Sequence, residues 1–125
     1  MDDSILNSIK KLLGIAPEYT QFDQDIVMHI NAVFLTLYEL GVGPREGFSI
    51  SDSTATWDSY IVDSNTLALD AVKIYVYQKV RLAFDPPATA AMFDALKESS
   101  REFEWRLSVL VDPSTDNGFD SIGGE

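Results

Sequence analysis

The sequence contains no cysteine and only one histidine. The absence of cysteine excludes a disulfide framework, a thiolate metal site and a cysteine nucleophile. No run of about 18 apolar residues occurs, so we expect no membrane-spanning helix. The first residues, MDDSILNSIKK, are acidic and then amphipathic, unlike a signal peptide with its basic start and apolar middle. We therefore expect the protein to remain in the cytoplasm in which it is made.

Basic residues are also scarce. Nine lysines and arginines stand against 20 acids, which gives a net charge of −11. Lysine and arginine carry most nucleic-acid affinity, so this balance argues against a protein that grips phosphates. The sequence lacks the motifs of P-loop nucleotide binding, the serine nucleophile elbow, HExxH zinc proteases and EF-hands. We expect neither an enzyme nor a bound cofactor.

His29 is the single histidine, and Asp25 precedes it by one helical turn. A metal or acid–base site would need further ligands, and only Asp23 and Glu39 are near in sequence. The simpler interpretation is a histidine at the solvated edge of a helix. An enzyme with a carboxylate metal site around His29 remains a third, weaker alternative.

The stretch AVKIYVYQKVRLAFDPP, residues 71–87, predicts a helix that is hydrophobic almost all round. Such a helix is buried on most sides, so we expect residues 65–84 to form the central helix of a bundle or a helix shared with a neighbouring subunit. Ile74 and Val76 are both expected in the core. Pro86 and Pro87 end the helix sharply. The strip predicted to face water consists of Asp70, Lys73, Tyr77 and Arg81.

Three further helices are predicted, at residues 4–13, 23–40 and 89–111. Gly14 and Gly41 end the first two, and Asp2 or Asp3 is the expected N-cap of the first. The connection 41–64 is long, and its segments 48–50 and 55–57 could pair as a short hairpin. The fold class is therefore mainly α: a small bundle of about four helices around a central apolar helix. Residues 1–111 form the single domain, and residues 112–125 an acidic, flexible tail.

Apolar residues on two helices fall outside the predicted core stripes. Met28, Ala32 and Leu35 form a second stripe on the helix 23–40, and Trp105 lies opposite the core stripe of the helix 89–111, near Glu98 and Arg101. Aromatic anchors with charged rims are typical of protein interfaces, so we interpret both sets as contact surface. The alternative is that the 41–64 loop covers one of them. The predicted core stripes are Ile5, Leu6, Ile9, Leu12 and Leu13 in the first helix, Ile26, Val27, Ile30, Val33, Phe34, Leu37 and Leu40 in the helix 23–40, and Met92, Leu96, Phe103, Leu107 and Leu110 in the last.

Charged side chains along the last helix alternate in sign at helical spacing. The acids precede the bases by three or four residues, the spacing of intrahelical ion pairs worth only about 0.2–0.5 kcal/mol each. This ladder is either a solvated face or a surface that meets a neighbouring subunit. It comprises Asp94, Glu98 and Glu102 with Lys97, Arg101 and Arg106.

The segments VYQKVRLAFDPP and EFEWRL, preceded by ILNSIKKLLGI and TWDSYI in that order, resemble the small head–tail connector proteins of long-tailed bacteriophages over residues 4–111. The resemblance implies a structural virion protein that forms a ring, commonly of about a dozen copies. The ring would dock under the portal of the filled head, extend the DNA channel and carry the next head-completion or tail-joining protein. DNA would pass without specific binding, and assembly would take place in the bacterial cytoplasm.

Two parts of the sequence acquire expected roles from this resemblance. The loop acids Glu46, Asp52, Asp58 and Asp63 would repel DNA if they lined the channel. Phe119 and Ile122 in the tail would anchor it to a partner. The alternative from another class is a cytoplasmic helical adaptor or regulator that acts as a dimer through Trp105 and the helix 23–40.

Overall fold

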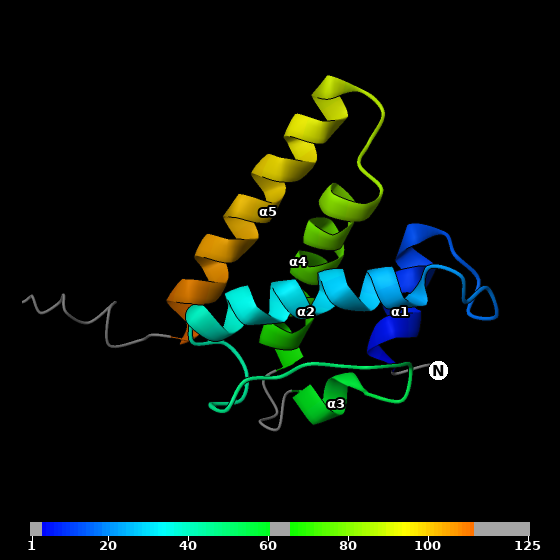
Figure 1. Cartoon of the computed structure of the whole chain (residues 1–125). Coiled ribbons are helices and arrows are strands. Elements are labelled where there is room, and N and C mark those ends of the chain that lie inside the picture. Colours follow the sequence, from blue (N-terminus) through cyan, green and yellow to red (C-terminus); the bar gives the residue numbers. More distant parts are fainter. Residues whose placement is uncertain (1–3, 61–65, 112–125) are drawn as a thin grey trace, which may run out of the picture.

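The computed structural model describes residues 4–60 and 66–111. The described chain is helical, as predicted, and contains no β-strand; the expected hairpin does not form. Four long helices surround a common core, and a single short helix lies in the connection between the second and third of them (Figure 1). The helices are α1 (Ile5–Leu13), α2 (Asp23–Glu39), α3 (Trp57–Tyr60), α4 (Thr66–Phe84) and α5 (Ala90–Val111).

Helix α4 is the central element, as its apolar sequence predicts. It contacts α1, α2 and α5, and α2 crosses it while α5 runs back beside it (Figure 1). Val72, Tyr75, Val76 and Val80 are fully buried and recur at the three- and four-residue steps of one helical face. Tyr75 is a core residue that the apolar pattern of the sequence does not predict.

The prediction that Ile74 is buried is wrong, because its side chain is 42% exposed. The predicted water-facing strip is also only partly right. Asp70 is exposed, but Lys73, Tyr77 and Arg81 are half-buried, and the Arg81 guanidinium donates to the Tyr77 hydroxyl at 3.0 Å. Three neighbouring helices leave α4 one open face, and that face includes an isoleucine.

Helix α5 begins after the Pro86-Pro87 break, where the Thr89 hydroxyl accepts a hydrogen bond from the Met92 amide at 3.2 Å. Its predicted core stripe is only partly buried: Leu107 is fully buried and Phe103 packs at the edge of the core, while Met92 and Leu110 are exposed. The reason is that α5 packs chiefly on α4. A single neighbouring helix buries a narrower face of α5 than the face on which its apolar residues lie.

Helix α1 is capped by Ser4, whose hydroxyl accepts from the Asn7 amide, rather than by Asp2 or Asp3. Gly14 ends it with a left-handed φ of 83°, as predicted. Leu12, assigned to the core stripe by the sequence, is exposed, because α1 is short and only one face meets α2 and α4.

Lys10, in the last turn of α1, is fully buried. Its ammonium group lies 2.7 Å from the Asp23 carboxylate and donates to the carbonyl oxygens of Pro17 and Tyr19 at 3.0 and 2.7 Å. Two carbonyl oxygens accept hydrogen bonds from the ammonium group, and the carboxylate balances its charge as an ion pair. The lysine therefore connects the end of α1 to the turn before α2 and to the first residue of α2.

The connection after α2 packs into the core instead of projecting as a free loop. Val42, Ile50, Trp57 and Tyr60 are buried. The Asn31 side chain on α2 bonds both backbone groups of Ile50, at 2.8 and 2.9 Å. In place of the predicted hairpin, the segment before α3 pairs with the start of α1 through a single bridge between Ser4 and Thr56.

Candidate interaction surfaces

The outer face of α2 carries exposed apolar side chains. Met28 and Leu35 are 62% and 59% exposed, and Ala32 between them is exposed as well. The opposite face of α2 holds the core residues Ile30 and Phe34. The 41–56 connection packs on the Phe34 side, where the centroid of the Phe48 ring lies 5.3 Å from that of the Phe34 ring. It leaves Met28, Ala32 and Leu35 open, so these residues remain available for contact. Tyr38, also exposed, extends the same face and was not predicted.

Trp105 on α5 is 66% exposed. Glu98 and Arg101, its predicted charged neighbours, are exposed and 3.7 Å apart. An exposed pair at this distance contributes little to stability. These residues therefore lie on the exposed surface of α5 and contribute little to the stability of the fold.

Two of the three predicted ion pairs on α5 form. Glu98 meets Arg101, and Glu102 meets Arg106 at 2.9 Å. Within the described chain, Lys97 makes no ion pair with Asp94 or with any other acid. This leaves Lys97 as an uncompensated cation on an acidic protein.

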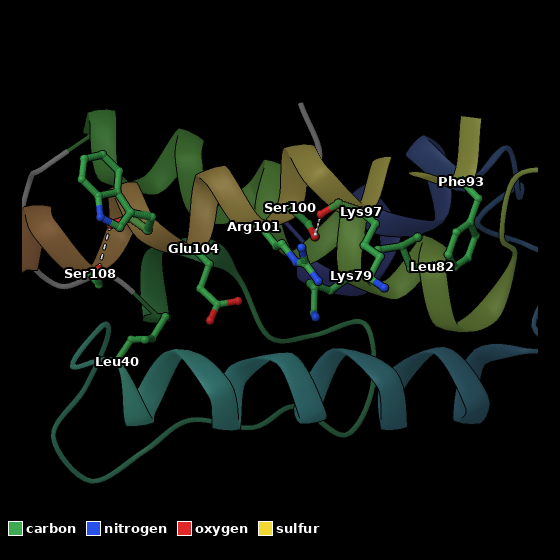
Figure 2. Close-up of a pocket in the computed structure, with 10 residues that line it drawn as sticks. Leu40, Lys79, Leu82, Phe93, Lys97, Ser100, Arg101, Glu104 and Ser108 are labelled. Carbon is green, nitrogen blue, oxygen red and sulfur yellow. Dashed lines mark hydrogen bonds between the residues drawn. The ribbon is translucent and has the colours of Figure 1, made fainter. Parts of the chain in front are cut away.

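A groove of about 650 Å³ lies between α2 on one side and α4 and α5 on the other. Figure 2 shows the side chains of Lys79, Arg101 and Glu104 pointing toward α2. Leu40 and Ser108 lie at one end, and Leu82 and Phe93 at the other (Figure 2). Trp105, Lys97 and Ser100 complete the lining.

The groove has more bases than acids. Lys79, Lys97 and Arg101 line it with Glu104 as the only acid among the lining residues. The sequence does not reveal this site because its lysines come from two helices, α4 and α5, and Leu40 is the residue that caps α2. The only signal was the weakly basic character of the segment around residues 67–85 in an acidic chain.

Glu104 is held by the core beneath it. Its carboxylate accepts a hydrogen bond of 2.9 Å from the hydroxyl of the buried Tyr75. Burial raises the pKa of Tyr75 above its ordinary value, and the hydrogen bond to Glu104 and its charge act in the same direction. The tyrosine thus stays protonated and keeps the carboxylate at the floor of the groove.

The loop acids predicted to face a channel are exposed where the structure describes them. Glu46, Asp52 and Asp58 are exposed, whereas Asp63 lies outside the described residues. Asp52 also has a local role, because it accepts hydrogen bonds from the side chain and the amide of Thr54. These bonds, that of the Thr54 side chain first, lower the pKa of Asp52. Phe119 and Ile122, the predicted tail anchors, lie outside the described residues too.

His29 is half-buried, and its ring lies 6.2 Å from that of Phe84 in an edge-to-face arrangement. It therefore packs between α2 and the end of α4. Among the described residues, no cluster of three or more histidine or acidic side chains could hold a metal ion. None of the described helices combines the length and apolarity needed to cross a membrane.

These features define a class: a small helical protein with exposed apolar side chains on α2 and exposed apolar and charged side chains on α5. Comparison with known families identifies it further. The family model described as phage connector protein matches residues 5–114, most of the chain. The chain therefore belongs to the phage connector family, structural proteins of the head–tail junction in the virion neck that associate with portal and tail proteins. No curated protein and no solved structure matches the chain.

Proposed function

We propose that this protein assembles into a ring of about a dozen copies beneath the portal of the filled phage head. The ring extends the DNA channel and carries the next head-completion or tail-joining protein. Membership of the connector family supports the location. The observation that carries the ring is the presence of exposed apolar residues on two different helices, α2 and α5.

Two distinct patches suit a ring for a geometric reason. In a ring each subunit offers one surface to its left neighbour and a different surface to its right neighbour, whereas a two-fold dimer uses one self-complementary surface. The outer face of α2, with Met28, Ala32 and Leu35, provides one patch. Trp105 with Glu98 and Arg101 on α5 provides the other.

The remaining surfaces fit the same proposal. Glu46, Asp52 and Asp58 give the loop an acidic surface, and a lumen lined by acids lets DNA slide because it repels phosphate. Asp63 belongs to the same proposed surface. The domain of residues 1–111 assembles in the bacterial cytoplasm, and the tail 112–125 contacts the portal or the next neck protein through Phe119 and Ile122.

The direct test is electron microscopy and mass photometry of the purified protein over a range of concentrations, alone and with the portal protein encoded by the same phage. Rings that bind the portal support the proposal. A dimer that forms no ring under any of these conditions would instead favour the cytoplasmic adaptor.

Trp105→Ala tests the proposed anchor. The side chain is exposed in the monomer, so the variant should fold with unchanged helicity. If Trp105 is buried between subunits, assembly should weaken by about 2 kcal/mol or more per contact. Leu12→Ala on α1 removes another exposed apolar side chain and serves as the control, with assembly unchanged. Equal assembly of both variants would remove Trp105 from the interface.

A further inference from the structure

The groove between α2, α4 and α5 has a chemistry opposite to that of the whole chain. The protein carries a net charge of −11, yet three of the four charged side chains that line the groove are bases. Lys79 and Lys97 make no ion pair in the described part of the chain. Cations gathered without partners at a concave surface attract an anionic ligand.

The ends of the groove are apolar. Leu40 lies at the end near Ser108, and Leu82 and Phe93 at the opposite end. Trp105, which also lines the groove, precedes Ser108 by about one helical turn. A ligand that fits must therefore be acidic in its middle and carry apolar groups toward one end. This pattern describes a peptide better than a free phosphate or a uniformly charged polymer.

The residues that follow α5 have this pattern. Residues 112–125 contain four acids (Asp112, Asp116, Asp120 and Glu125) and no base. Their large apolar residues are Phe119 and Ile122. The segment starts four residues after Ser108, which already lines one end of the groove.

The lengths agree as well. Along α5, the distance from Val111, the residue before the segment, back to Phe93 is about 27 Å at 1.5 Å per residue. An extended chain that starts at Asp112 reaches about 24 Å at Phe119 and about 34 Å at Ile122. A segment that runs back along the groove from the end of α5 would therefore bring Phe119 and Ile122 to Leu82 and Phe93, and would pass Asp116 over the lysines.

We propose that, in the unassembled subunit, the acidic segment 112–125 binds the basic groove of its own chain. Phe119 and Ile122 contact the apolar end formed by Leu82 and Phe93, and Asp116 and Asp120 pair with Lys79 and Lys97. Attachment to the same chain gives the segment a millimolar effective concentration at the groove, so individually weak pairs suffice. A second copy's segment would have to compete with this local excess.

This contact would also cover part of Trp105, which lines the groove. The bound segment and a neighbouring subunit could not both occupy that surface, so release of the segment would accompany assembly. The intramolecular contact is a property of the free chain, however, and is tested without reference to rings or portal. Its failure and the failure of the proposed function are therefore separate results.

The test uses zero-length carbodiimide cross-linking, which joins a lysine amine to a carboxylate, on the full chain at a concentration where sedimentation velocity shows monomers. Peptide mapping should find segment 112–125 joined to Lys79 and Lys97, and not to the exposed Lys11 of α1. An equal mixture of unlabelled and ¹⁵N-labelled chains should give cross-links within one label only. Mixed pairs would assign the groove to the segment of a second copy and overturn the proposal.

A charge-reversal variant distinguishes electrostatic attraction between the segment and the groove from mere proximity of the segment to Lys97. Lys79→Glu should strongly reduce the cross-link at the untouched Lys97, while Lys11→Glu, with the same change in net charge, should leave it intact. The cross-links should be lost in about 1 M salt, where the screening length falls to about 3 Å. Unchanged Lys97 cross-links in Lys79→Glu, or cross-links to Lys11 as frequent as those to the groove, would show that the groove does not bind the segment.

Truncation after Val111 provides an independent readout. Quenching of Trp105 fluorescence by acrylamide should increase in the truncated chain and return when a synthetic 112–125 peptide is added at about millimolar concentration. No change on truncation would contradict the proposal. Binding of a short DNA duplex by the full chain, abolished in Lys79→Glu, would also contradict it, since the groove would then hold phosphate.

Discussion

The ammonium group of Lys10 is a charge removed from water, and its surroundings provide an ion-pair partner and two hydrogen-bond acceptors. Burying an ion is costly unless it is paired and hydrogen-bonded, and here one carboxylate and two carbonyl oxygens meet it. The same contacts bring Pro17, Tyr19 and Asp23 together. This single side chain thereby determines how the chain turns between α1 and α2.

Two neighbouring positions on α4 should respond differently to the same substitution. Val76 is fully buried and Ile74 is 42% exposed. Val76→Asp places an unpaired charge in the core and should cost more than about 3 kcal/mol, enough to unfold a domain of this size. Ile74→Asp should remain folded. Circular dichroism melts of both variants check this, and similar melting of the two would mean that α4 is not oriented as described.

The buried tyrosines make stability sensitive to high pH. Burial raises the pKa of Tyr60 and of Tyr75 above 10. Above about pH 10 the unfolded chain loses these protons while the folded chain keeps them, so stability is full below that pH and falls above it, by up to about 1.4 kcal/mol per pH unit for each tyrosine. Tyr75→Phe should make the decline between pH 10 and 11 shallower in denaturant titrations. Tyr38→Phe, at an exposed position, should leave it unchanged, and equal slopes for the two variants would refute the assignment.

At the scale of elements, the connection between α2 and α4 behaves as part of the core. Phe34 of α2 contacts Phe48, Trp57 and Tyr60 at ring-centroid distances between 4.7 and 6.3 Å. The Trp57 indole donates to the Ser8 hydroxyl on α1 at 2.8 Å. The connection thus supports α1 and α2 together, while Glu46, Asp52 and Asp58 stay at the surface.

Gly43 tests how tightly this connection is packed, and Gly14 at the end of α1 provides the comparison. Gly14 and Gly43 both have a left-handed φ, 83° and 93°. A Cβ at Gly14 would meet nothing within 4 Å, whereas a Cβ at Gly43 would lie 2.7 Å from the Tyr60 hydroxyl oxygen. Gly14→Ala should cost about 1–2 kcal/mol from backbone strain. Gly43→Ala should cost this and about 1–3 kcal/mol more for overpacking, as measured by urea unfolding. Equal costs would mean that the connection moves aside freely.

At the scale of the whole molecule, the acidic balance of the chain bears on the proposed passage of DNA. Glu46→Lys with Asp58→Lys would turn two exposed loop acids into bases. Asp52 is best left unchanged because it holds Thr54. If the loop lines the channel, rings should form normally, but the infectious yield of phage carrying the double variant should fall as phosphate adheres to the lumen.

The control for this experiment reverses the same number of exposed acids elsewhere. Glu18→Lys with Asp85→Lys changes the net charge equally at exposed positions outside the loop and should leave the yield unaffected. If both double variants give the wild-type yield with intact rings, the loop does not face the DNA.

The sequence alone determined the features that depend on local chemistry. Gly14 ends α1 and the Pro86-Pro87 pair separates α4 from α5, because each acts on the backbone within about one turn. Helical periodicity was enough to place Met28, Leu35 and Trp105 away from the core, since it needs only the spacing of residues in one helix. The order of the segments ILNSIKKLLGI, TWDSYI, VYQKVRLAFDPP and EFEWRL along the chain was enough to indicate the connector family.

The tertiary structure decided what depends on distant neighbours. Whether Ile74, Met92 or Leu110 is covered depends on which helices lie beside α4 and α5, and periodicity within one helix does not contain that information. The sequence predicts a long loop with a possible hairpin over residues 41–64. The described part of it packs into the core instead, because its partners are distant in sequence: Ser8, 49 residues from Trp57, and Asn31, 19 residues from Ile50. The buried Lys10 and the basic groove also arise only when separate elements meet, since burial and charge compensation are properties of the assembled core rather than of a segment.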